Sequence, residues 1–489
     1  MDVDELLLAG PVGEVVLRLD EAVTRRRLRQ LVAERHGRLA DAGAGAGSSV
    51  AVHLPPSLEY IAVVLAVWRA GAQAILIDHR FTDYEVASCL ERLRPQLAVE
   101  PVGAVARPMR GFHDIGSKVV ALPGGVPAAG GHALIQFSSG STGPSKIIGR
   151  GAEDLVAEVE RYTRIDGFPS SGRQVVSLAS LTNVLGLVGG LLNSLHTGAE
   201  LVLPRHTGTG GILRCLAAAG SPAVLLAVPS QLELLARVSA PPPTPLFEGA
   251  ITGGELLRDE LWNSFADRYC VRIGTMYGMT EAGVMATDLS GAHRPELTPA
   301  PGHEFRVEDG ELLLHRPESP YLGATDPGRW ADGWLRTRDA GSVDPVTGRV
   351  TVLGRLDSQI SVNGLKVDLN EVEQLLAHAP GVTEAVVVHD GAIRAYVALD
   401  DAGHGTAPVE AWLKERLAPY KRPRAVHALP VLPRTSSGKP VRSASALAEA
   451  RQGAARSARE GVSRSARQDV DRSARQDVGR SARQDVGRS

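Results

Sequence analysis

Apolar and polar positions over residues 50–99 alternate between two periods. Short apolar runs of strand length are separated by longer segments in which apolar residues recur at helical spacing. The expected strands are Val50–Leu54, Ala74–Ile77 and Leu97–Val99, and the expected helices are Leu58–Ala70, with Ser57 as its N-cap, and Tyr84–Leu93. Because strands that alternate with helices favour a parallel sheet, we predict an α/β fold built on doubly wound sheets.

The same pattern returns at Val175–Leu178, Glu200–Leu203 and Val224–Val228. Ligands of such sheets bind at the carboxyl ends of the strands. From about residue 300 the pattern changes to short alternating runs, such as Glu311–His315 and Arg349–Leu353, which predict hairpins of a small β-subdomain packed on the larger unit.

A compact α+β set follows residue 357. Its expected elements are strand Gln359–Val362, helix Leu369–His378, strands Glu384–His389 and Arg394–Leu399, and helix Val409–Leu417. We therefore predict a large domain over residues 1–356 and a small mobile domain over residues 357–450, with the linker at Asp357.

The end of the chain repeats Arg-Ser-Ala-Arg every eight residues. Residues 451–489 hold ten arginines and five acidic residues, and the repeats contain almost nothing apolar that could form a core. We predict a disordered tail. Its arginines either dock on a partner or remain solvated.

Length and charge narrow the class of protein. A chain of 489 residues exceeds what one hydrophobic core usually serves, and 43% hydrophobic with 22% charged residues is typical of a globular protein. A net charge of −2 gives no general attraction to nucleic acid or to anionic membranes. The acidic amino terminus is unlike a signal peptide and no apolar run is long enough to span a bilayer, so we expect a cytoplasmic protein.

Candidate chemistry begins with a Ser/Gly-rich loop that follows the apolar stretch Ala133–Ile135. Glycines, hydroxyls and a lysine together suit a polyphosphate, although a loop of this composition is also an ordinary surface connection. Its lysine is not followed by Ser or Thr as in the kinase P-loop. The expected phosphate ligands are Ser138, Ser139, Gly140, Ser141, Thr142, Gly143 and Lys146.

The loop resembles the phosphate-binding loop of the adenylate-forming superfamily of acyl- and aryl-CoA synthetases, peptide-synthetase adenylation domains and luciferases. Four further segments resemble the motifs of that superfamily in its order and spacing. They are Thr252–Leu256, Tyr277–Glu281, Gly333–Asp339 with Gly354–Arg355, and Pro433–Lys439. The similarity extends over roughly residues 10–450. Pro144 stands one position early and Ile147 replaces a glycine, which puts the mobility of the loop in doubt.

The resemblance implies ATP and Mg²⁺ as cofactors. The backbone of Gly253, Gly254 and Glu255 would lie against adenine, Tyr277, Gly278 and Met279 would stack on and border the base, and Asp339 with Arg355 would hold the ribose. Thr280 would contact phosphate, and Glu281 would help to bind Mg²⁺. Lys439 would be the catalytic residue of adenylation, because its charge would stabilise the negative charge that develops at the α-phosphate.

The resemblance also implies a second half-reaction. Asp357 would be the hinge about which the small domain turns, and Gly364 and Lys366 would line the tunnel for a phosphopantetheine thiol, although Gly364 also fits a plain turn. Asn183, Gly253 and Gly278 would border the acid substrate. An α-amino acid is disfavoured because Val184 stands where an aspartate would pair with the ammonium group. Asn183 could bind a ring hydroxyl or amino group, which favours an aromatic acid, or be satisfied by backbone.

The leading prediction is an acid–thiol ligase that joins a carboxylic acid to CoA or to a carrier protein by way of an acyl-adenylate. One alternative passes the adenylate to an amine. Another is a non-catalytic member that binds nucleotide or a partner. Retention of Lys146, Glu281, Asp339 and Lys439 together disfavours this last alternative.

Overall fold

A computed structural model describes residues 3–103, 111–128, 130–138, 146–323, 328–400, 405–434 and 440–454. The chain forms two compact units. The first extends to Glu371 and includes Arg416–Tyr420, and the second comprises Val372–Glu415 and the chain from Lys421 onward. Asp357 lies within the first unit, and its role as a hinge stays a prediction.

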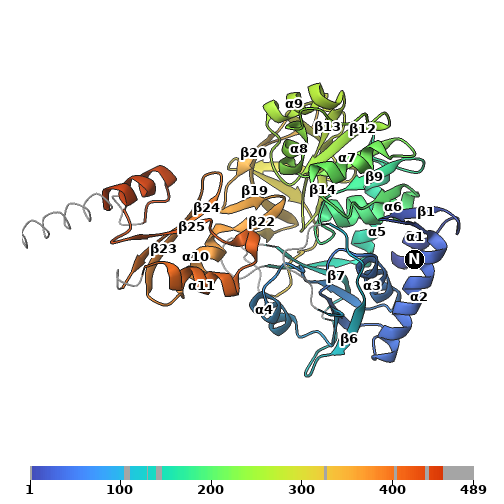
Figure 1. The fold of residues 1–489 in the computed structure, drawn as a ribbon, viewed down its shortest axis with the longest axis horizontal. Coiled ribbons are helices and arrows are strands. Elements are labelled where there is room, and N and C mark those ends of the chain that lie inside the picture. Colours follow the sequence, from blue (N-terminus) through green and yellow to red (C-terminus); the bar gives the residue numbers. More distant parts are fainter. Residues whose placement is uncertain are drawn as a thin grey trace, which may run out of the picture. The chain divides into compact units, whose positions relative to one another are not determined.

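The first unit contains a six-stranded sheet in the order β6-β5-β3-β4-β7-β8 (Figure 1). The strands are β3 (Ser49–Val52), β4 (Gln73–Leu76), β5 (Leu97–Pro101), β6 (Ser117–Ala121), β7 (His132–Ser138) and β8 (Lys146–Gly151). Strands β5, β3, β4 and β7 are parallel, whereas β6 and β8 are antiparallel edges. Helices α3 (Leu58–Arg69) and α4 (Asp83–Leu93) alternate with these strands. The Ser57 hydroxyl caps α3 by accepting from the Tyr60 amide at 2.9 Å, as expected.

A second sheet of the same unit joins fourteen strands within the described residues, and most of them follow the order β16-β17-β19-β20-β15-β14-β13-β12-β11-β9-β10-β1-β2. Its α/β part holds β1 (Val15–Arg18), β2 (Ala22–Thr24), β9 (Gln174–Ser177), β10 (Glu200–Val202), β11 (Ala223–Ala227), β12 (Phe247–Gly253) and β13 (Arg272–Met279). Its antiparallel part holds β14 (Gly283–Asp288), β15 (Glu296–Pro299), β16 (Phe305–Glu308), β17 (Glu311–His315), β18 (Trp330–Ala331), β19 (Trp334–Val343) and β20 (Val350–Arg355). The predicted α/β class and the β-subdomain after residue 300 are thus confirmed.

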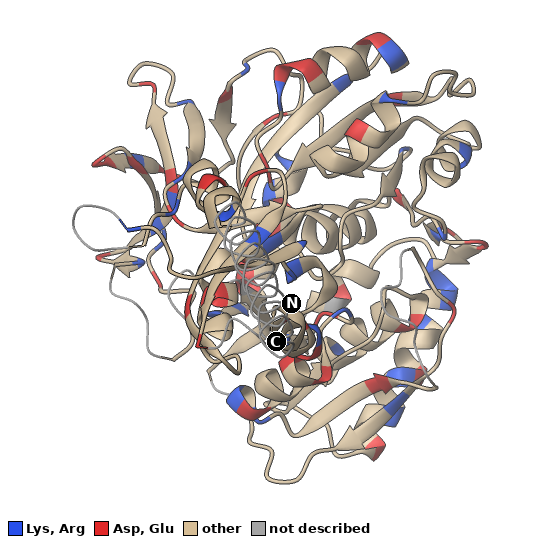
Figure 2. Cartoon of the chain, turned by 60° about the vertical axis from the view of Figure 1, so that its left-hand side comes forward, with Lys and Arg blue, Asp and Glu red and all other residues tan. Residues whose placement is uncertain are grey.

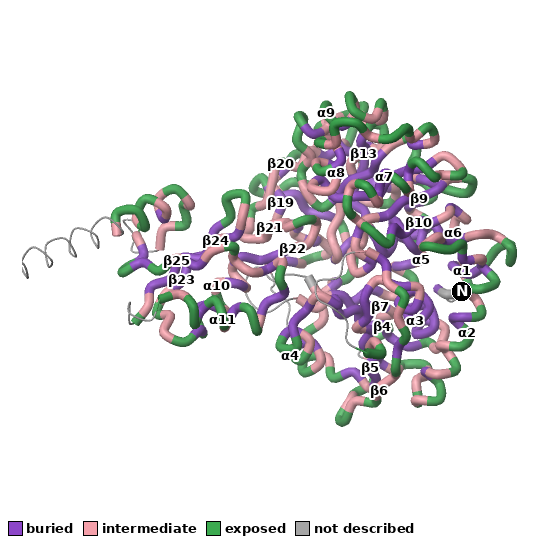
Figure 3. The backbone as a smooth tube through the Cα atoms, viewed as in Figure 1, coloured by how far each residue is buried: buried purple, intermediate pink, exposed green. Residues whose placement is uncertain are grey.

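Helices cover the sheets and enclose a core of buried aliphatic residues. They are α1 (Val3–Leu8), α2 (Arg25–Asp41), α5 (Ala152–Thr163), the π-helix η1 (Leu185–Leu192), α6 (Asn193–Thr197), α7 (Thr209–Ala217), α8 (Pro229–Ala236) and α9 (Asp259–Tyr269). Figure 3 shows that the buried residues follow the strands and the inner faces of these helices. The unit ends with the hairpin β21 (Gln359–Val362) and β22 (Leu365–Asp368) and the start of α10 (Leu369–Ala377).

The second unit has a three-stranded sheet of β23 (Val382–His389), β24 (Ile393–Leu399) and β25 (Ala425–Leu429), together with α11 (Ala407–Arg416) except its last residue. A 3₁₀ turn, Pro419–Lys421, begins in the first unit and ends in the second. A helix over residues 444–454 packs on this sheet through Leu447, Ala450 and Ala454. Residues 451–454, which the sequence analysis assigned to the tail, belong to this helix, and Ala454 packs against the core of the second unit. The remaining repeats lie outside the described residues.

Basic and acidic side chains are interspersed over the described chain (Figure 2). In the same residues, none of the helices is long and apolar enough to cross a membrane.

Candidate active site

The predicted phosphate loop joins β7 to β8. Ser138 ends β7 and is paired with Lys146, which begins β8, so the hairpin brings both ends of the loop together. The predicted ligands Ser139, Gly140, Ser141, Thr142 and Gly143 lie outside the described residues. Lys146 Nζ lies 5.9 Å from the centre of the Tyr321 ring, in a cation–π contact. Burial lowers the pKa of Lys146 to about 8, and the charge of Arg329 adds to this effect.

The carboxyl end of β12 presents bare backbone. Gly253 ends the strand opposite Met276 of β13, and a Cβ on Gly253 would lie 2.7 Å from the Met276 carbonyl oxygen. Gly254 has a φ of +92°, and a Cβ there would meet nothing within 4 Å. The two glycines therefore allow close packing against β13 on one side and leave open space beside Gly254, as a flat ligand requires.

Tyr277 lies two residues before the end of β13 and contacts the β-subdomain. Its hydroxyl donates to Asp339 Oδ2 at 2.6 Å, and its ring stacks on Phe305 with centroids 6.4 Å apart. Gly278, the next residue, is closely packed, because a Cβ there would lie 2.5 Å from the carbonyl oxygen of Gly283. Burial first, and then the neighbouring Asp339 carboxylate, raise the pKa of Tyr277, so the hydroxyl stays a donor.

The turn between β13 and β14 carries Thr280 and Glu281, beside Met279. Glu281 is buried, and its Oε1 accepts a hydrogen bond from the Tyr321 hydroxyl at 3.3 Å. Glu281 also acts electrostatically on Lys146, whose pKa it raises against the effect of burial. An anionic carboxylate and a cationic ammonium group therefore border the same region.

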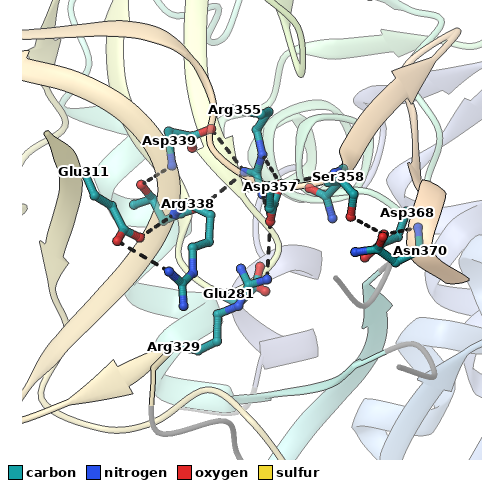
Figure 4. A network of polar contacts seen from close by, with 12 residues as sticks. Glu281, Glu311, Arg329, Arg338, Asp339, Arg355, Asp357, Ser358, Asp368 and Asn370 are labelled. Atoms are coloured by element: carbon teal, nitrogen blue, oxygen red, sulfur yellow. Dashed lines mark hydrogen bonds and ion pairs between the residues drawn. The ribbon is translucent and has the colours of Figure 1, made fainter. Parts of the chain in front are cut away.

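A polar network extends from Asp339 to the β21–β22 hairpin (Figure 4). Arg355 Nη1 donates to Asp339 Oδ1 at 3.1 Å, and Arg355 Nη2 donates to both oxygens of Asp357 at 2.7 Å. Arg329 Nη2 reaches Asp357 Oδ2 at 3.3 Å. Burial raises the pKa of Asp339 in spite of Arg355 and Tyr277. Burial would likewise raise the pKa of Asp357, but the Arg355 guanidinium outweighs it and the pKa is lowered.

The turn of the β21–β22 hairpin contacts the end of β12 within the first unit. Lys366 Nζ donates to the Gly254 carbonyl at 2.5 Å, and the Gly364 amide donates to Glu255 Oε1 at 3.3 Å. Asn183 Nδ2 donates to the Gly364 carbonyl at 3.4 Å. Gly364 has a φ of +79°, and a Cβ there would lie 2.4 Å from Val228 Cγ1. The hairpin thus joins the predicted thiol, adenine and acid residues.

Lys439 lies outside the described residues. The residues that flank its segment, Arg434 and Pro440, pair in an antiparallel bridge, and Arg434 Nη2 donates to Glu384 Oε1 at 2.7 Å. Both contacts lie in the second unit.

Two residues that contact the candidate active site were not predicted from the sequence. Tyr321 and Arg329 precede β18, in a stretch without a motif or a repeat, yet Tyr321 contacts Lys146 and Glu281, and Arg329 contacts Asp357. No signal in this single sequence distinguishes them from other loop residues.

The side chains available as metal ligands decide which kind of metal site the protein can form. Among the residues that the structure describes, no cluster of three or more His, Cys, Asp or Glu side chains could hold an ion. Mg²⁺ commonly uses one or two carboxylates together with substrate phosphates and water. Glu281 therefore fits Mg²⁺ that arrives with a nucleotide, and does not fit a site made by protein alone.

A large α/β unit with these groups at the carboxyl ends of its strands, followed by a small α+β unit, is the architecture of adenylate-forming enzymes. A family model for AMP-binding enzymes matches residues 11–319, and one for the AMP-binding enzyme C-terminal domain matches residues 371–439. The chain therefore belongs to the AMP-binding enzymes of the adenylate-forming superfamily.

Individual relatives agree with this assignment. One relative is a CoA ligase of Mycobacterium tuberculosis that acts on a propanoyl group bearing a methyl-dioxo-octahydroindenyl ring system. It is 28% identical over 89% of this chain and 96% of its own length. A salicylyl-CoA synthase / salicylate adenylyltransferase of a Streptomyces species is 27% identical over 78% and 79%, respectively. A solved malonyl-CoA ligase with methylmalonyl-CoA and AMP bound has a TM-score of 0.72 and 25% identity over 87% of this chain and 98% of that one.

Proposed function

We propose that this enzyme uses ATP to convert a carboxylic acid to an acyl-adenylate and then transfers the acyl group to a phosphopantetheine thiol. The observation that carries the proposal is the gathering of Lys146, Glu281, Gly254 and the Tyr277–Asp339 pair within one unit. Lys146 supplies a cation for the phosphates, Glu281 a carboxylate for the metal, Gly254 open backbone for the adenine, and Asp339 an acceptor for the ribose hydroxyls. Recognition of MgATP needs these four groups.

ATP binding follows from these groups. The adenine lies over Gly254 beside Tyr277, whose other face is supported by Phe305. Each oxygen of Asp339 already accepts one protein hydrogen bond and retains a lone pair for a ribose hydroxyl. The Ser138–Lys146 segment and Thr280 hold the phosphates. Glu281 would hold Mg²⁺ that arrives with the nucleotide, and the ion would supply positive charge to neutralise the phosphates.

Adenylation is an in-line displacement. A carboxylate oxygen of the acid attacks the α-phosphorus, and the bond from that phosphorus to the bridging oxygen of pyrophosphate breaks. Lys439, on the second unit, would stabilise the charge that builds on the α-phosphate oxygens. In the second step the thiolate sulfur attacks the acyl carbonyl, and AMP leaves with the electron pair of the cleaved carbon–oxygen bond.

The thiol step is assigned to the β21–β22 hairpin. Its turn residue Gly364 contacts Asn183 and Glu255 through backbone atoms, and Lys366 contacts Gly254. A pantetheine arm that follows this backbone would reach the acyl group near β12. Asp357, three residues before Ile360, is proposed as the hinge that exchanges this hairpin for Lys439 between the two steps.

An aromatic acid is the proposed substrate class. Asn183 uses one amide hydrogen on Gly364, so its second hydrogen and its carbonyl oxygen stay available for a hydroxyl or amino substituent on a ring. The similarity to a salicylate-activating relative supports the same class. Gly253 and Gly278 would border the ring because neither carries a side chain.

Acid-dependent exchange of pyrophosphate into ATP tests the reaction and the substrate together. Across a panel of aromatic and aliphatic acids, we expect exchange with substituted benzoic acids. The Lys439→Ala variant should lose the exchange by a factor of at least 100, while thiol transfer from a preformed acyl-adenylate stays within a few-fold of wild type. An unchanged exchange rate in this variant would contradict the role of Lys439.

The acceptor is identified by product analysis with CoA, with an acyl carrier protein and with an amine in separate reactions. A thioester as the main product supports the proposal. An amide that forms without any thiol would replace it with the amine-transfer alternative.

A further inference from the structure

A buried ion pair lies beneath the candidate active site, and the chemistry proposed above does not use it. Arg150 of β8 and Glu158 of α5 are 1% and 0% exposed, and Arg150 Nη1 pairs with Glu158 Oε2. Burying two charges costs several kcal/mol, and a well-packed apolar pair of similar volume is often as stable. Packing alone therefore does not account for the pair.

The second oxygen of Glu158 binds the backbone beside the predicted phosphate and metal residues. Glu158 Oε1 accepts the Val284 amide at 3.1 Å. Gly283 has a φ of +77°, and a Cβ there would lie 2.3 Å from the Glu158 carboxylate carbon. The carboxylate thus fits directly against the backbone of residues 283–284, which begin β14 immediately after the turn that carries Thr280 and Glu281.

The first partner of Glu158 comes from the strand that follows the phosphate loop. Arg150 lies four residues after Lys146 on β8, and its Nη2 also donates to the Asp154 carbonyl at 3.4 Å. His303 is also hydrogen-bonded to the Val284 backbone. Burial, with repulsion from Arg161, lowers the pKa of His303 to about 3, so this neighbour stays neutral at working pH. The hydrogen bond from the Val284 amide to Glu158 links α5 to the start of β14.

We propose that Arg150 and Glu158 are positioning residues that fix the Thr280–Glu281 turn relative to Lys146. They would thereby keep the metal-binding carboxylate of Glu281 and the phosphate-binding ammonium group of Lys146 in fixed positions relative to one another. Through Glu158 on α5, the salt bridge to Arg150 and the hydrogen bond from Val284 together connect β8 of the six-stranded sheet with β14 of the larger sheet. The inference rests on the proposed roles of Glu281 and Lys146 in MgATP binding.

The test replaces the pair with apolar residues in the full-length enzyme. The Arg150→Met/Glu158→Leu double variant should fold, because no charge is left unpaired. In the protein without nucleotide or metal, backbone amides of residues 277–285 should exchange hydrogen at least tenfold faster. The KM for MgATP should rise at least tenfold, and the KM for the acid should stay within about twofold of wild type.

A control uses a second ion pair of the same unit, in which the carboxylate is buried and the guanidinium is partly exposed. Glu59 is 6% exposed and pairs with Arg35 at 2.7 Å, away from the turn. The Arg35→Met/Glu59→Leu variant should be destabilised to a similar extent without faster exchange at residues 277–285. Unchanged exchange and unchanged KM for MgATP in the folded Arg150→Met/Glu158→Leu variant would overturn the inference.

Two single variants complete the comparison. If the double variant does not fold, Glu158→Gln, which keeps an acceptor for Val284 but loses the ion pair, should still raise both the exchange rate and the KM for MgATP, and wild-type values would overturn the inference. Glu281→Gln tests the proposed function separately. If it leaves the KM for MgATP unchanged, the role of Glu281 fails, whereas the hydrogen-exchange comparison still decides whether Arg150 and Glu158 fix the turn.

Discussion

Lys146 is a half-buried cation placed between an aromatic ring and several charged groups. It lies 5.9 Å from the centre of the Tyr321 ring, and burial brings the pKa of its ammonium group to about 8. Because the pKa is lowered from that of a free lysine, the charged form is fully present only below pH 8. Phosphate recognition that depends on this charge must therefore weaken as the pH rises through 8.

The pH dependence of kcat/KM for ATP tests this reasoning. We expect a descending limb with an apparent pKa of about 8 in the wild-type enzyme, because kcat/KM reports ionisation of the free enzyme. Lys146→Arg should move the limb to higher pH, since guanidinium stays charged. Lys118→Met, at an exposed lysine paired with Glu100, should leave the profile unchanged. If the descending limb of the Lys146→Arg variant stays at about pH 8, the ionisation belongs to another group.

Asp339 allows a second experiment at the scale of one side chain. If its oxygens accept the ribose hydroxyls, the wild-type enzyme should prefer ATP over 2′-deoxyATP by about tenfold or more, which corresponds to the ~1.5–3 kcal/mol of a hydrogen bond to a charged group. In Asp339→Asn this preference should fall toward unity. The matched control is Asp288→Asn. Asp288 is buried at the end of β14, and its carboxylate accepts a hydrogen bond from the His293 amide. An undiminished preference for ATP over 2′-deoxyATP in Asp339→Asn would mean that Asp339 does not bind the ribose hydroxyls.

At the scale of elements, the turn of the β21–β22 hairpin leaves no room for a side chain on Gly364. Gly364→Ala would place a methyl group 2.4 Å from Val228 and force a φ of +79° on alanine. We expect thioester formation to fall at least tenfold while pyrophosphate exchange stays within about twofold, because the first half-reaction does not need a thiol path. Gly391→Ala, at a φ of +78° with open space around it, controls for backbone strain alone. Equal loss of both half-reactions would argue for a general defect.

The elements also show what one sequence can predict. The sequence pattern predicted α3, β4 and β17 to within a residue or two, because each is a mostly apolar run that is buried along nearly its whole length. The motif residues of β12, β13 and β19 came from the resemblance to the adenylate-forming superfamily and not from periodicity, and their roles stay predictions. The π-helix η1 was not predicted, since its run of Leu, Val and Gly has no periodicity that distinguishes it from an α-helix.

Partners across the fold were equally hidden from the sequence. Glu158 and Tyr321 are ordinary residues of a helix and a loop until the fold places them against Val284 and Glu281. A pairing between distant segments depends on which elements become neighbours, and that information is absent from local patterns. For the same reason the Tyr277–Asp339 hydrogen bond could not be inferred from two separate motifs.

At the scale of the whole molecule, the proposed reaction is divided between two compact units. The first holds the groups assigned to nucleotide, acid and thiol, and the second holds the segment between Arg434 and Pro440 that contains Lys439. A two-step reaction suits this division, because one unit can present different groups to the other in turn. The central claim is that the acid is activated on the α-phosphate of ATP.

Transfer of labelled oxygen tests that claim most directly. When the carboxyl group of the acid carries ¹⁸O and the acyl-adenylate is resolved by a thiol or by water at the acyl carbon, one carboxyl oxygen must remain on AMP. Mass spectrometry should therefore find AMP with a single ¹⁸O and unlabelled pyrophosphate. Label in inorganic phosphate together with formation of ADP would mean an acyl phosphate, and would contradict adenylation.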